Sequence, residues 1–466
     1  MNGPSSREPS SPPAPPVRAP RRARALAATA VAAVALLGAA AVLLRRPSAA
    51  APALAETTRR IEMRLAYAPA DPHRPFAPRK ALPEQPAAEM LAALERKTDA
   101  TGFAAALLLR DDPSLVDEAL KRLEPLPSTP EVETNRAAAL LAKGKPEEAL
   151  RHLGRALEGQ NGLPQALWNR ALALKALDLR RTASRDFEAV AARNEPGWSA
   201  EARTRAFALI SADKSRRERW QSGVKMGQEL VASGALPSAA VLAGRPASLR
   251  GFFYDAVRTR TSAEQVRALL PVARELDRGS GADVLSRHLE AIASRDFARR
   301  APLVRDYEQL RKGALPPAGT QALIAALLRS GEDDLVLGAL ERAEVVAANL
   351  ETFEARAQVA RGEDQSARRT LADALERCAT EKVELRCLHL EQALAELDTR
   401  LGRLDDAWTH ALGGWRKAGV LGEWAQENVA LGQLAKLAKL RNDAALARAY
   451  EEELAERTRG NADARR

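Results

Sequence analysis

The sequence predicts an all-α fold, a solenoid of stacked helical hairpins that is preceded by one transmembrane helix. The segment from Asn135 to Leu140 returns as Asn169 to Leu174. The two copies are separated by about 34 residues, a period typical of helical-hairpin repeats. Aromatic residues make up 4% of the chain and interspersed charged residues 28%, which suits amphipathic helices packed through small residues. The uncharged stretch 25–44 precedes the repeats and predicts the transmembrane helix.

Residues 1–24 form the first expected segment, a basic tail rich in proline and serine. It lacks the apolar residues of a core, so we expect it to be disordered. The first 64 residues contain ten arginines and three acidic residues, and they therefore carry most of the net charge of +10. The body is nearly neutral and shows no basic stripe, which gives little support for nucleic-acid binding.

The segment 25–44 consists of Ala, Leu and Val with one Thr and one Gly. A helix of 20 residues covers the roughly 30 Å of bilayer hydrocarbon, so we expect a membrane anchor. A cleaved signal peptide is the alternative, because Ala53-Leu54-Ala55 matches a small-x-small cleavage site. Arg45 and Arg46 directly after the apolar run favour the anchor. The denser arginine cluster at 18–24 predicts an inside N-terminus and a body outside the cytoplasm, with a cytoplasm-facing body as the alternative.

Residues 45–82 are a Pro-rich juxtamembrane linker. Within it Ile61, Met63, Leu65 and Tyr67 alternate with polar or small residues, which predicts one short extended segment that docks on the first helices.

The repeat array is expected over 83–458 and is followed by a disordered tail, 459–466. Its first two units are 130–161 and 164–196, and the defining residues are small or apolar helix positions and one turn glycine: Ala137, Gly144, Ala149, Ala171, Ala183 and Phe187. A second, longer spacing relates Gly362, Gly402 and Asn442, and likewise Ala367, Ala407 and Ala447, which predicts longer hairpins at 346–377, 382–416 and 420–457. Helices without a clear period are expected from Pro196 to Leu315.

These repeats, the span, and the segment from Ile61 to Phe76 resemble the N-terminal half of bacterial tetratricopeptide proteins that continue into a caspase-like CHAT peptidase domain. The resemblance includes the segments Trp168 to Leu174 and Phe252 to Ala256, and the pairs Arg377-Cys378 and Arg386-Cys387. It implies a single-pass protein of the bacterial inner membrane whose periplasmic repeats recognise or regulate a partner. Because this chain ends at Arg466, we expect no peptidase domain and no peptidase activity.

Cys378 closes one predicted helix and Cys387 opens the next, so a disulfide between them is geometrically possible. It would stabilise the fold by about 2.5 to 3 kcal/mol through loop closure. Two buried free thiols are the alternative. The five histidines are scattered and match no metal-binding pattern, and we expect neither a metal nor a cofactor.

The inner helices of the first two units would present a candidate peptide groove lined by Thr134, Ala138, Leu141, Trp168, Leu172 and Lys175. Trp168 is either an exposed anchor for a peptide or a side chain buried against the preceding hairpin. Asn135 and Asn169 are candidates for binding peptide backbone, or they make local structural hydrogen bonds.

No sequence motif of an enzyme is present: the chain lacks a P-loop, a dinucleotide-binding glycine motif, a nucleophile elbow and a zinc-protease motif. We therefore predict a non-enzymatic, membrane-anchored scaffold that binds a protein or peptide partner and no small-molecule substrate. The alternative function is the recognition half of a split caspase-like peptidase system.

Overall fold

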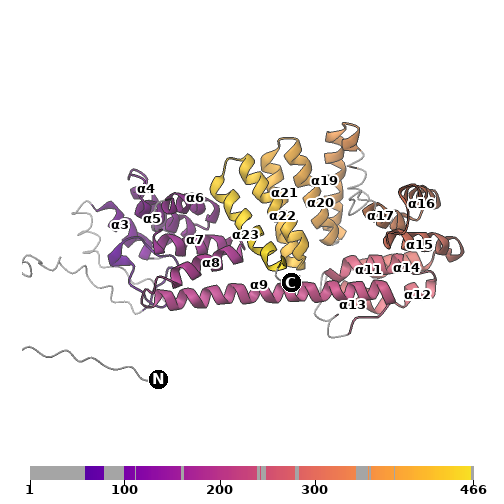
Figure 1. Cartoon of the computed structure of the whole chain (residues 1–466). Helices are drawn as coiled ribbons and strands as arrows, with labels where there is room; N and C mark the ends of the chain where they lie inside the picture. Colours follow the sequence, from indigo (N-terminus) through magenta and orange to yellow (C-terminus); the bar gives the residue numbers. More distant parts are fainter. Residues whose placement is uncertain are drawn as a thin grey trace, which may run out of the picture. The chain divides into compact units, whose positions relative to one another are not determined.

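The described part of the chain is helical. The computed structural model describes residues 58–77, 99–110, 112–158, 162–238, 242, 248–278, 283–342, 355, 358–381 and 384–462. Within these ranges the β structure is one isolated bridge, between Arg59 and Phe76, and the regular elements are helices (Figure 1). Successive helices pack side by side. The predicted all-α helical-repeat fold is confirmed at this level.

The predicted span 25–44 and tail 1–24 lie outside the described residues, as do 45–57 and 78–82 of the predicted linker and 463–466 of the C-terminal tail. The prediction of a disordered tail from 459 is wrong for residues 459–462, which continue the last helix. Among the helices that the structure describes, none combines the length and the apolar character that a bilayer crossing needs.

Four helices occupy the two predicted units 130–161 and 164–196. They are α5 (Pro130–Ala142), α6 (Pro146–Leu157), α7 (Pro164–Ala176) and α8 (Arg180–Ala191). Three begin at a proline, whose fixed φ suits the first helical position. Ahead of them lie the 3₁₀ turn η1 (Ala68–Ala70), α3 (Ala100–Leu109) and α4 (Pro113–Leu123).

The hairpins turn through residues with a left-handed backbone. These residues are Gly144, Asp178, Gly362, Gly402 and Asn442, with φ of 69°, 61°, 78°, 72° and 57°. Asp178 is the residue of the second repeat that corresponds to Gly144 in the first. The left-handed backbone is kept there, because Asp and Asn tolerate it better than other non-glycine residues. The amide after each left-handed residue then bonds back into the helix, as in Lys145 N to Leu140 O at 2.9 Å.

The repeat-defining side chains are buried where the hairpins meet. Each of the following has 0% exposure: Ala137, Ala149, Ala171, Ala183, Phe187, Ala367 and Ala407. Small side chains at these positions let the helix axes approach closely.

The region without a clear period begins with a single long helix, α9 (Trp198–Ser233). The helices that the structure describes after it, up to residue 342, are α11 (Ser248–Arg258), α12 (Ala263–Arg267), α13 (Leu270–Arg278), α14 (Val284–Ala293), α15 (Phe297–Arg311), α16 (Pro317–Ser330) and α17 (Asp333–Arg342). They pack around two separate apolar clusters, one centred on Phe253 and one on Tyr307. A continuous 36-residue helix is not a repeat hairpin, so the array is interrupted here.

The C-terminal hairpins are formed by α19 (Asp364–Glu381), α20 (Glu384–Arg400), α21 (Leu404–Leu421), α22 (Trp424–Leu440) and α23 (Ala444–Ala462). The predicted units 382–416 and 420–457 correspond to α20 with α21 and to α22 with α23. Most of the first helix of the predicted unit 346–377 lies outside the described residues.

The C-terminal hairpins also pack against the first repeats, which a strictly sequential solenoid would not do. Helix α23 contacts α6 and α8, and one apolar cluster includes Leu153 and Leu174 together with Leu434 and Tyr450. The Glu453 carboxylate on α23 accepts hydrogen bonds from Arg181 N at 3.1 Å and Thr182 N at 2.9 Å, and so caps α8, which has no side-chain cap of its own.

Candidate peptide-binding grooves

Residues 58–77, which we call the strap, form an extended segment that returns on itself. Its two ends are joined by hydrogen bonds from Arg59 N to Pro75 O and from Ala77 N to Arg59 O, both 3.0 Å. Between them the chain makes the short turn η1. The strap includes the alternating stretch from Ile61 to Tyr67, and the structure places that stretch against the first helices.

The two repeated asparagines hold the backbone of the strap. Asn169 on α7 accepts a hydrogen bond from Arg64 N at 2.9 Å and donates one to Arg64 O at 2.8 Å. Asn135, at the matching position of the preceding repeat on α5, accepts from Ala66 N at 2.8 Å. Trp168 Nε1 donates to Glu62 O at 2.9 Å. The bonded residues 62, 64 and 66 alternate along the strap, which is the spacing of one edge of an extended chain.

Apolar strap residues enter the core on either side of these hydrogen bonds. Ile61 is 5% and Leu65 1% exposed, and both belong to a cluster with α3, α4 and α5. Met63 packs against this cluster and against the aromatic cluster of Trp168 and Trp198. The strap is therefore a structural part of the first repeats.

Two strap arginines are buried beside aromatic rings and carboxylates. Arg64 binds Glu195 at 2.7 Å and also pairs with the strap's own Asp71, and its guanidinium carbon lies 4.2 Å from the centre of the Trp198 ring. Arg59 lies 4.5 Å from the same ring and bonds Glu201 through Nη1 at 2.7 Å. Planar guanidinium groups are suited to such sites, because they donate in pairs and stack on aromatic faces.

The electrostatics of Glu201 reflect this contact. Burial alone would raise the pKa of Glu201, but the hydrogen bond from Arg59 and the charges of Arg59 and Arg205 outweigh it and lower the pKa to about 2. The carboxylate is therefore ionised wherever the protein is folded near neutral pH, and it holds Arg59 as an ion pair.

Trp168 and Lys175 of the predicted peptide groove contact the strap, so this face is occupied by the chain itself. Trp168 is fully buried and lies edge-to-face with Phe187 at 5.1 Å and with Trp198 at 4.9 Å, so the exposed-anchor alternative is wrong. Thr134 is also fully buried, and its hydroxyl donates to Pro130 O within α5. Lys175 lies 3.3 Å from the carboxylate of Glu62 in the strap.

The remaining predicted groove residues, Ala138, Leu141 and Leu172, pack in the apolar clusters beneath the strap. Sequence analysis missed Arg59, Arg64, Glu195, Trp198 and Glu201, which provide the charged part of this site. The available signal was an apolar alternation interrupted by arginine, but its acidic partners follow Arg64 and Arg59 at separations of 131 and 142 residues.

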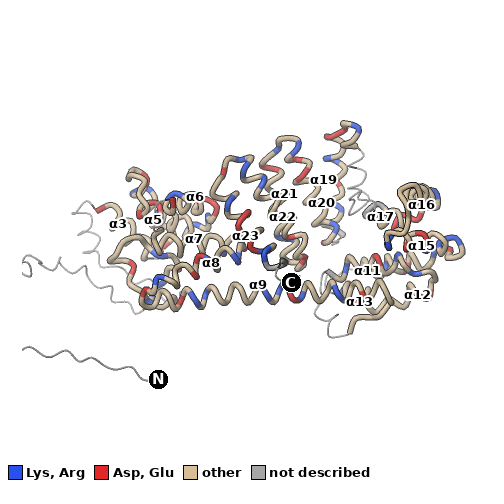
Figure 2. Tube along the Cα trace, in the orientation of Figure 1, with Lys and Arg blue, Asp and Glu red and all other residues tan. Residues whose placement is uncertain are grey.

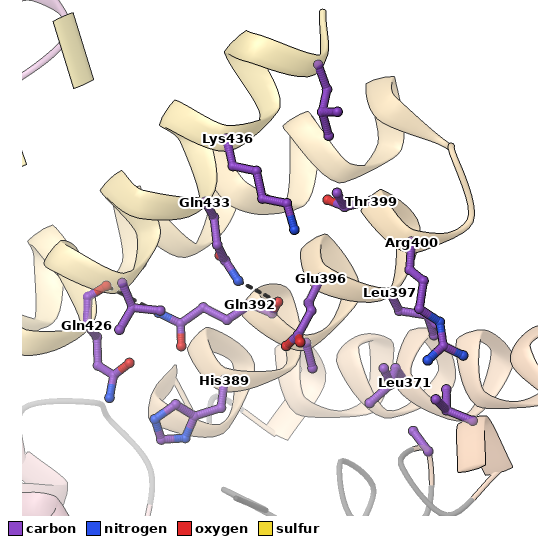
Figure 3. Close-up of a pocket in the computed structure, with 15 residues that line it drawn as sticks. Leu371, His389, Gln392, Glu396, Leu397, Thr399, Arg400, Gln426, Gln433 and Lys436 are labelled. Carbon is purple, nitrogen blue, oxygen red and sulfur yellow. Dashed lines mark hydrogen bonds between the residues drawn. The ribbon is translucent and has the colours of Figure 1, made fainter. Parts of the chain in front are cut away.

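A second groove lies on α20 and α22, and the structure gives it no occupant among the described residues. A cavity of about 670 Å³ is lined by side chains from these helices and by Ala355, Val359 and Leu371. Figure 3 shows Gln433 and Lys436 on one wall opposite Gln392 and Glu396. Gln392 Nε2 donates to Gln426 O at 3.2 Å, and Gln433 Nε2 donates to Gln392 O at 3.1 Å.

Apolar side chains complete this second groove. Val429 is 49% and Leu440 47% exposed, although both are large and apolar. Lys436 lies between them on α22 and makes no ion pair with any residue that the structure describes. We call this surface the C-terminal groove.

The structure joins Cys378 and Cys387 in a disulfide between the end of α19 and the start of α20, with Cα atoms 5.7 Å apart. Both residues are buried. The bond fastens the α19–α20 hairpin beside the C-terminal groove.

Within the described ranges, no group of three or more His, Cys, Asp or Glu residues could hold a metal ion. Burial lowers the pKa of His389, in the C-terminal groove, to about 4, and that of His288 likewise to about 4. Both imidazoles are therefore neutral near pH 7. Basic and acidic residues are interspersed along the helices, as Figure 2 shows.

Comparison with known proteins gives no family assignment. No family model matches the chain, and no curated protein matches it. Among solved structures, it is similar to a circular tandem repeat protein with novel repeat topology and enhanced subunit contact surfaces. The alignment has 17% identity, covers 80% of this chain and 87% of that one, and has a TM-score of 0.10. This score does not establish a shared fold.

The described part of the chain is an all-helical repeat protein. This description rests on the packing of neighbouring hairpins. The resemblance to the tetratricopeptide half of caspase-like proteins stays a hypothesis.

Proposed function

We propose that the chain is a membrane-anchored, non-enzymatic scaffold that binds an extended segment of a partner protein in the C-terminal groove. One observation carries the proposal. The groove combines half-exposed apolar residues with the amide side chains of Gln392 and Gln433, and amide side chains of α5 and α7 hold the main chain of the strap. Amide side chains beside apolar residues are suited to holding an extended segment, which gives its main chain hydrogen-bond partners and its side chains an apolar surface.

The chemistry of the C-terminal groove favours a particular segment. The Nε2 groups of Gln392 and Gln433 bond carbonyls of α22 and α20, so their amide oxygens would accept hydrogen bonds from the main chain of the segment. Val429 and Leu440 would bury its apolar side chains, and Lys436 would pair with an acidic residue. We therefore expect a partner segment that alternates apolar and acidic residues.

Site-specific photo-cross-linking tests this proposal in the full chain in its membrane. A benzoylphenylalanine at Val429 should give adducts that map to one extended segment of one partner. The same group at Leu328, which is 60% exposed on α16, should not give them. Gln433→Ala with Lys436→Ala should reduce the Val429 adduct several-fold, whereas Lys214→Ala, an exposed lysine of α9, should leave it unchanged.

Identical adducts from both positions, or a yield insensitive to Gln433 and Lys436, would contradict the proposal. A partner that carries a His/Cys peptidase domain would make the chain the recognition half of a split caspase-like system.

The anchor and the location outside the cytoplasm belong to the same proposal. The apolar segment 25–44 and the disulfide support them, since disulfides persist mainly in oxidising compartments. Alkylation in intact cells should find no reactive thiol. Two freely alkylated cysteines, or a reporter after Arg466 that is active only inside the cell, would place the body in the cytoplasm.

A further inference from the structure

Some contacts that hold the strap involve its main chain, and others depend on which side chains the strap carries. Three side chains of α5 and α7 bond the main chain at residues 62, 64 and 66, which any extended peptide could offer. By contrast, Glu195, Glu201 and Trp198 contact the guanidinium groups of Arg59 and Arg64. We call this surface of α5, α7 and the start of α9 the strap-binding face.

We infer that the strap-binding face is a sequence-selective peptide site for extended segments with two arginines five residues apart, and that residues 58–77 are its resident ligand. A free peptide with this pattern therefore competes with the strap for the face. This inference concerns a different surface from the C-terminal groove, and it can fail or stand independently of the proposed function.

The shape of the face supports selection, because backbone and glycine positions are fitted to the strap. Gly197 has φ of +75°, and a Cβ there would lie 2.1 Å from the His73 ring. A Cβ at Gly102, on α3 beside this face, would lie 2.6 Å from Asp99 Oδ2 and 2.8 Å from the ring of Tyr67. Any larger residue at either position would push the strap away. Both glycines lie in the body, so the body is shaped around its ligand.

The charges of the face support arginine at both positions. Arg64 is 2% and Arg59 3% exposed, so each needs a partner that satisfies a buried cation. Glu195 and Glu201 come from the body and each takes two hydrogen bonds from one guanidinium. A lysine ammonium offers neither the paired donors nor the planar stack on Trp198.

The two asparagines differ in how many hydrogen bonds they make to the strap, and this difference leaves one donor for another ligand. Asn169 makes both hydrogen bonds of its side-chain amide to Arg64. Asn135 accepts from Ala66 N, but its buried Nδ2 has no hydrogen-bond partner among the described residues. In a bound peptide, a carbonyl placed at Asn135 as Arg64 O is placed at Asn169 would accept a hydrogen bond from Asn135 Nδ2. Such a peptide would make one more hydrogen bond to the face than the strap makes.

The test uses the full chain and a fluorescein-labelled synthetic peptide of residues 57–77, with binding followed by fluorescence anisotropy. In the variant Arg59→Ala with Arg64→Ala the strap loses its ion pairs with Glu201 and Glu195 and its stacking on Trp198, so the peptide should bind. Binding to the wild type should be at least about tenfold weaker, because a tethered segment acts at an effective concentration near millimolar. A variant with Arg287→Ala, an exposed arginine of α14, should behave as wild type.

Selectivity is tested with two altered peptides. An Arg64→Lys peptide should bind the double variant at least about tenfold more weakly than the natural one. A peptide of scrambled sequence should not bind. Adding Asn169→Ala to the double variant should weaken capture of the natural peptide as well.

Hydrogen exchange on the wild-type chain keeps the inference testable if the double variant does not fold. Excess isotope-labelled peptide should remove the protection of the chain's own amides at Arg64 and Ala66, while α13 stays protected. The inference is overturned by a folded double variant that does not bind the peptide, by equal binding of the lysine peptide, or by strap protection that excess peptide leaves unchanged.

Discussion

Single side chains determine how the described elements are joined, and Asn169 and Glu423 show the two sides of burying a polar group. Asn169 is fully buried, and its amide satisfies both a donor and an acceptor of the strap. Glu423, 9% exposed at the start of α22, has a hydrogen bond from Trp220 but no cationic partner among the described residues to match its charge. Asn169 therefore stabilises the fold, because its polar groups are paired. Glu423 does so only while its carboxyl group is protonated, because burial penalises the charged form.

Glu423 predicts a loss of stability as the pH rises. Burial, with the nearby charge of Glu427, raises its pKa from 4.5 to about 7. The folded state therefore binds more protons than the unfolded state, and the free energy of unfolding falls between pH 4.5 and 7. Glu423→Gln removes this ionisation and should stabilise the protein at pH 8 by on the order of 3 kcal/mol, with little effect at pH 4.5.

Urea denaturation of both proteins at the two pH values measures the effect. If Glu423→Gln raises the free energy of unfolding equally at pH 4.5 and pH 8, the ionisation of Glu423 is not the cause of the increase. The exposed Glu118, in a surface pair with Arg122, supplies the control, because Glu118→Gln should change stability little at either pH.

At the scale of the helix, the turns determine where each hairpin ends. The left-handed residue and the hydrogen bond that follows it recur at Gly144, Asp178, Gly402 and Asn442, although the side chains differ. Gly402 and Asn442 are further apart in the sequence than Gly144 and Asp178, while the geometry of the turn is constant. The longer period is therefore a change in helix length, since α21 and α22 between the later turns have 18 and 17 residues, whereas α6 and α7 between the earlier turns have 12 and 13.

Two glycine substitutions separate backbone strain from packing at this scale. A Cβ at Gly402 or at Gly432 would meet nothing within 4 Å. Gly402 has φ of +72°, whereas Gly432 lies inside α22. Gly402→Ala should therefore destabilise the protein by about 1 kcal/mol, and Gly432→Ala should stabilise it by about 0.5 to 1 kcal/mol.

Thermal denaturation of the two variants is sufficient to compare them. Changes of the same sign would mean that the left-handed backbone of Gly402 does not control this hairpin.

At the scale of the whole molecule, packing between distant segments replaces the sequential order of a solenoid. Helix α23 contacts α6 and α8, and its Glu453 caps α8 although Thr182 lies 271 residues earlier in the chain. Further ion pairs cross the same contact, among them Arg151 with Asp443 at 2.7 Å. The first repeats and the last hairpin consequently share one apolar cluster.

Glu453→Gln should loosen this long-range contact. Burial raises the pKa of Glu453, while hydrogen bonds from Thr182 and Arg181 and the charge of Arg457 favour its ionised form. A neutral amide caps two N–H groups less well than a carboxylate, so we expect a loss of about 1 to 2 kcal/mol. Hydrogen exchange should become faster at the amides of Arg181 and Thr182 and stay unchanged in α13.

The exposed neighbour Glu451 supplies the comparison, since Glu451→Gln on the same helix should leave both amides protected. Equal exchange in the two variants would mean that the cap does not couple α23 to α8.

The sequence by itself determined the helical-repeat class, the hairpin turns and the repeated asparagines, because these depend on local backbone preference and on spacing along the chain. It also located the extended segment that becomes the strap. It did not reveal that this segment occupies the predicted groove and buries Trp168. Nor did it reveal that α9 is continuous or that α23 returns to α8. Those features depend on contacts such as Arg59 with Glu201 and Thr182 with Glu453, whose partners lie 142 and 271 residues apart. Sequence spacing carries no signal over that range, so only the tertiary structure decided them.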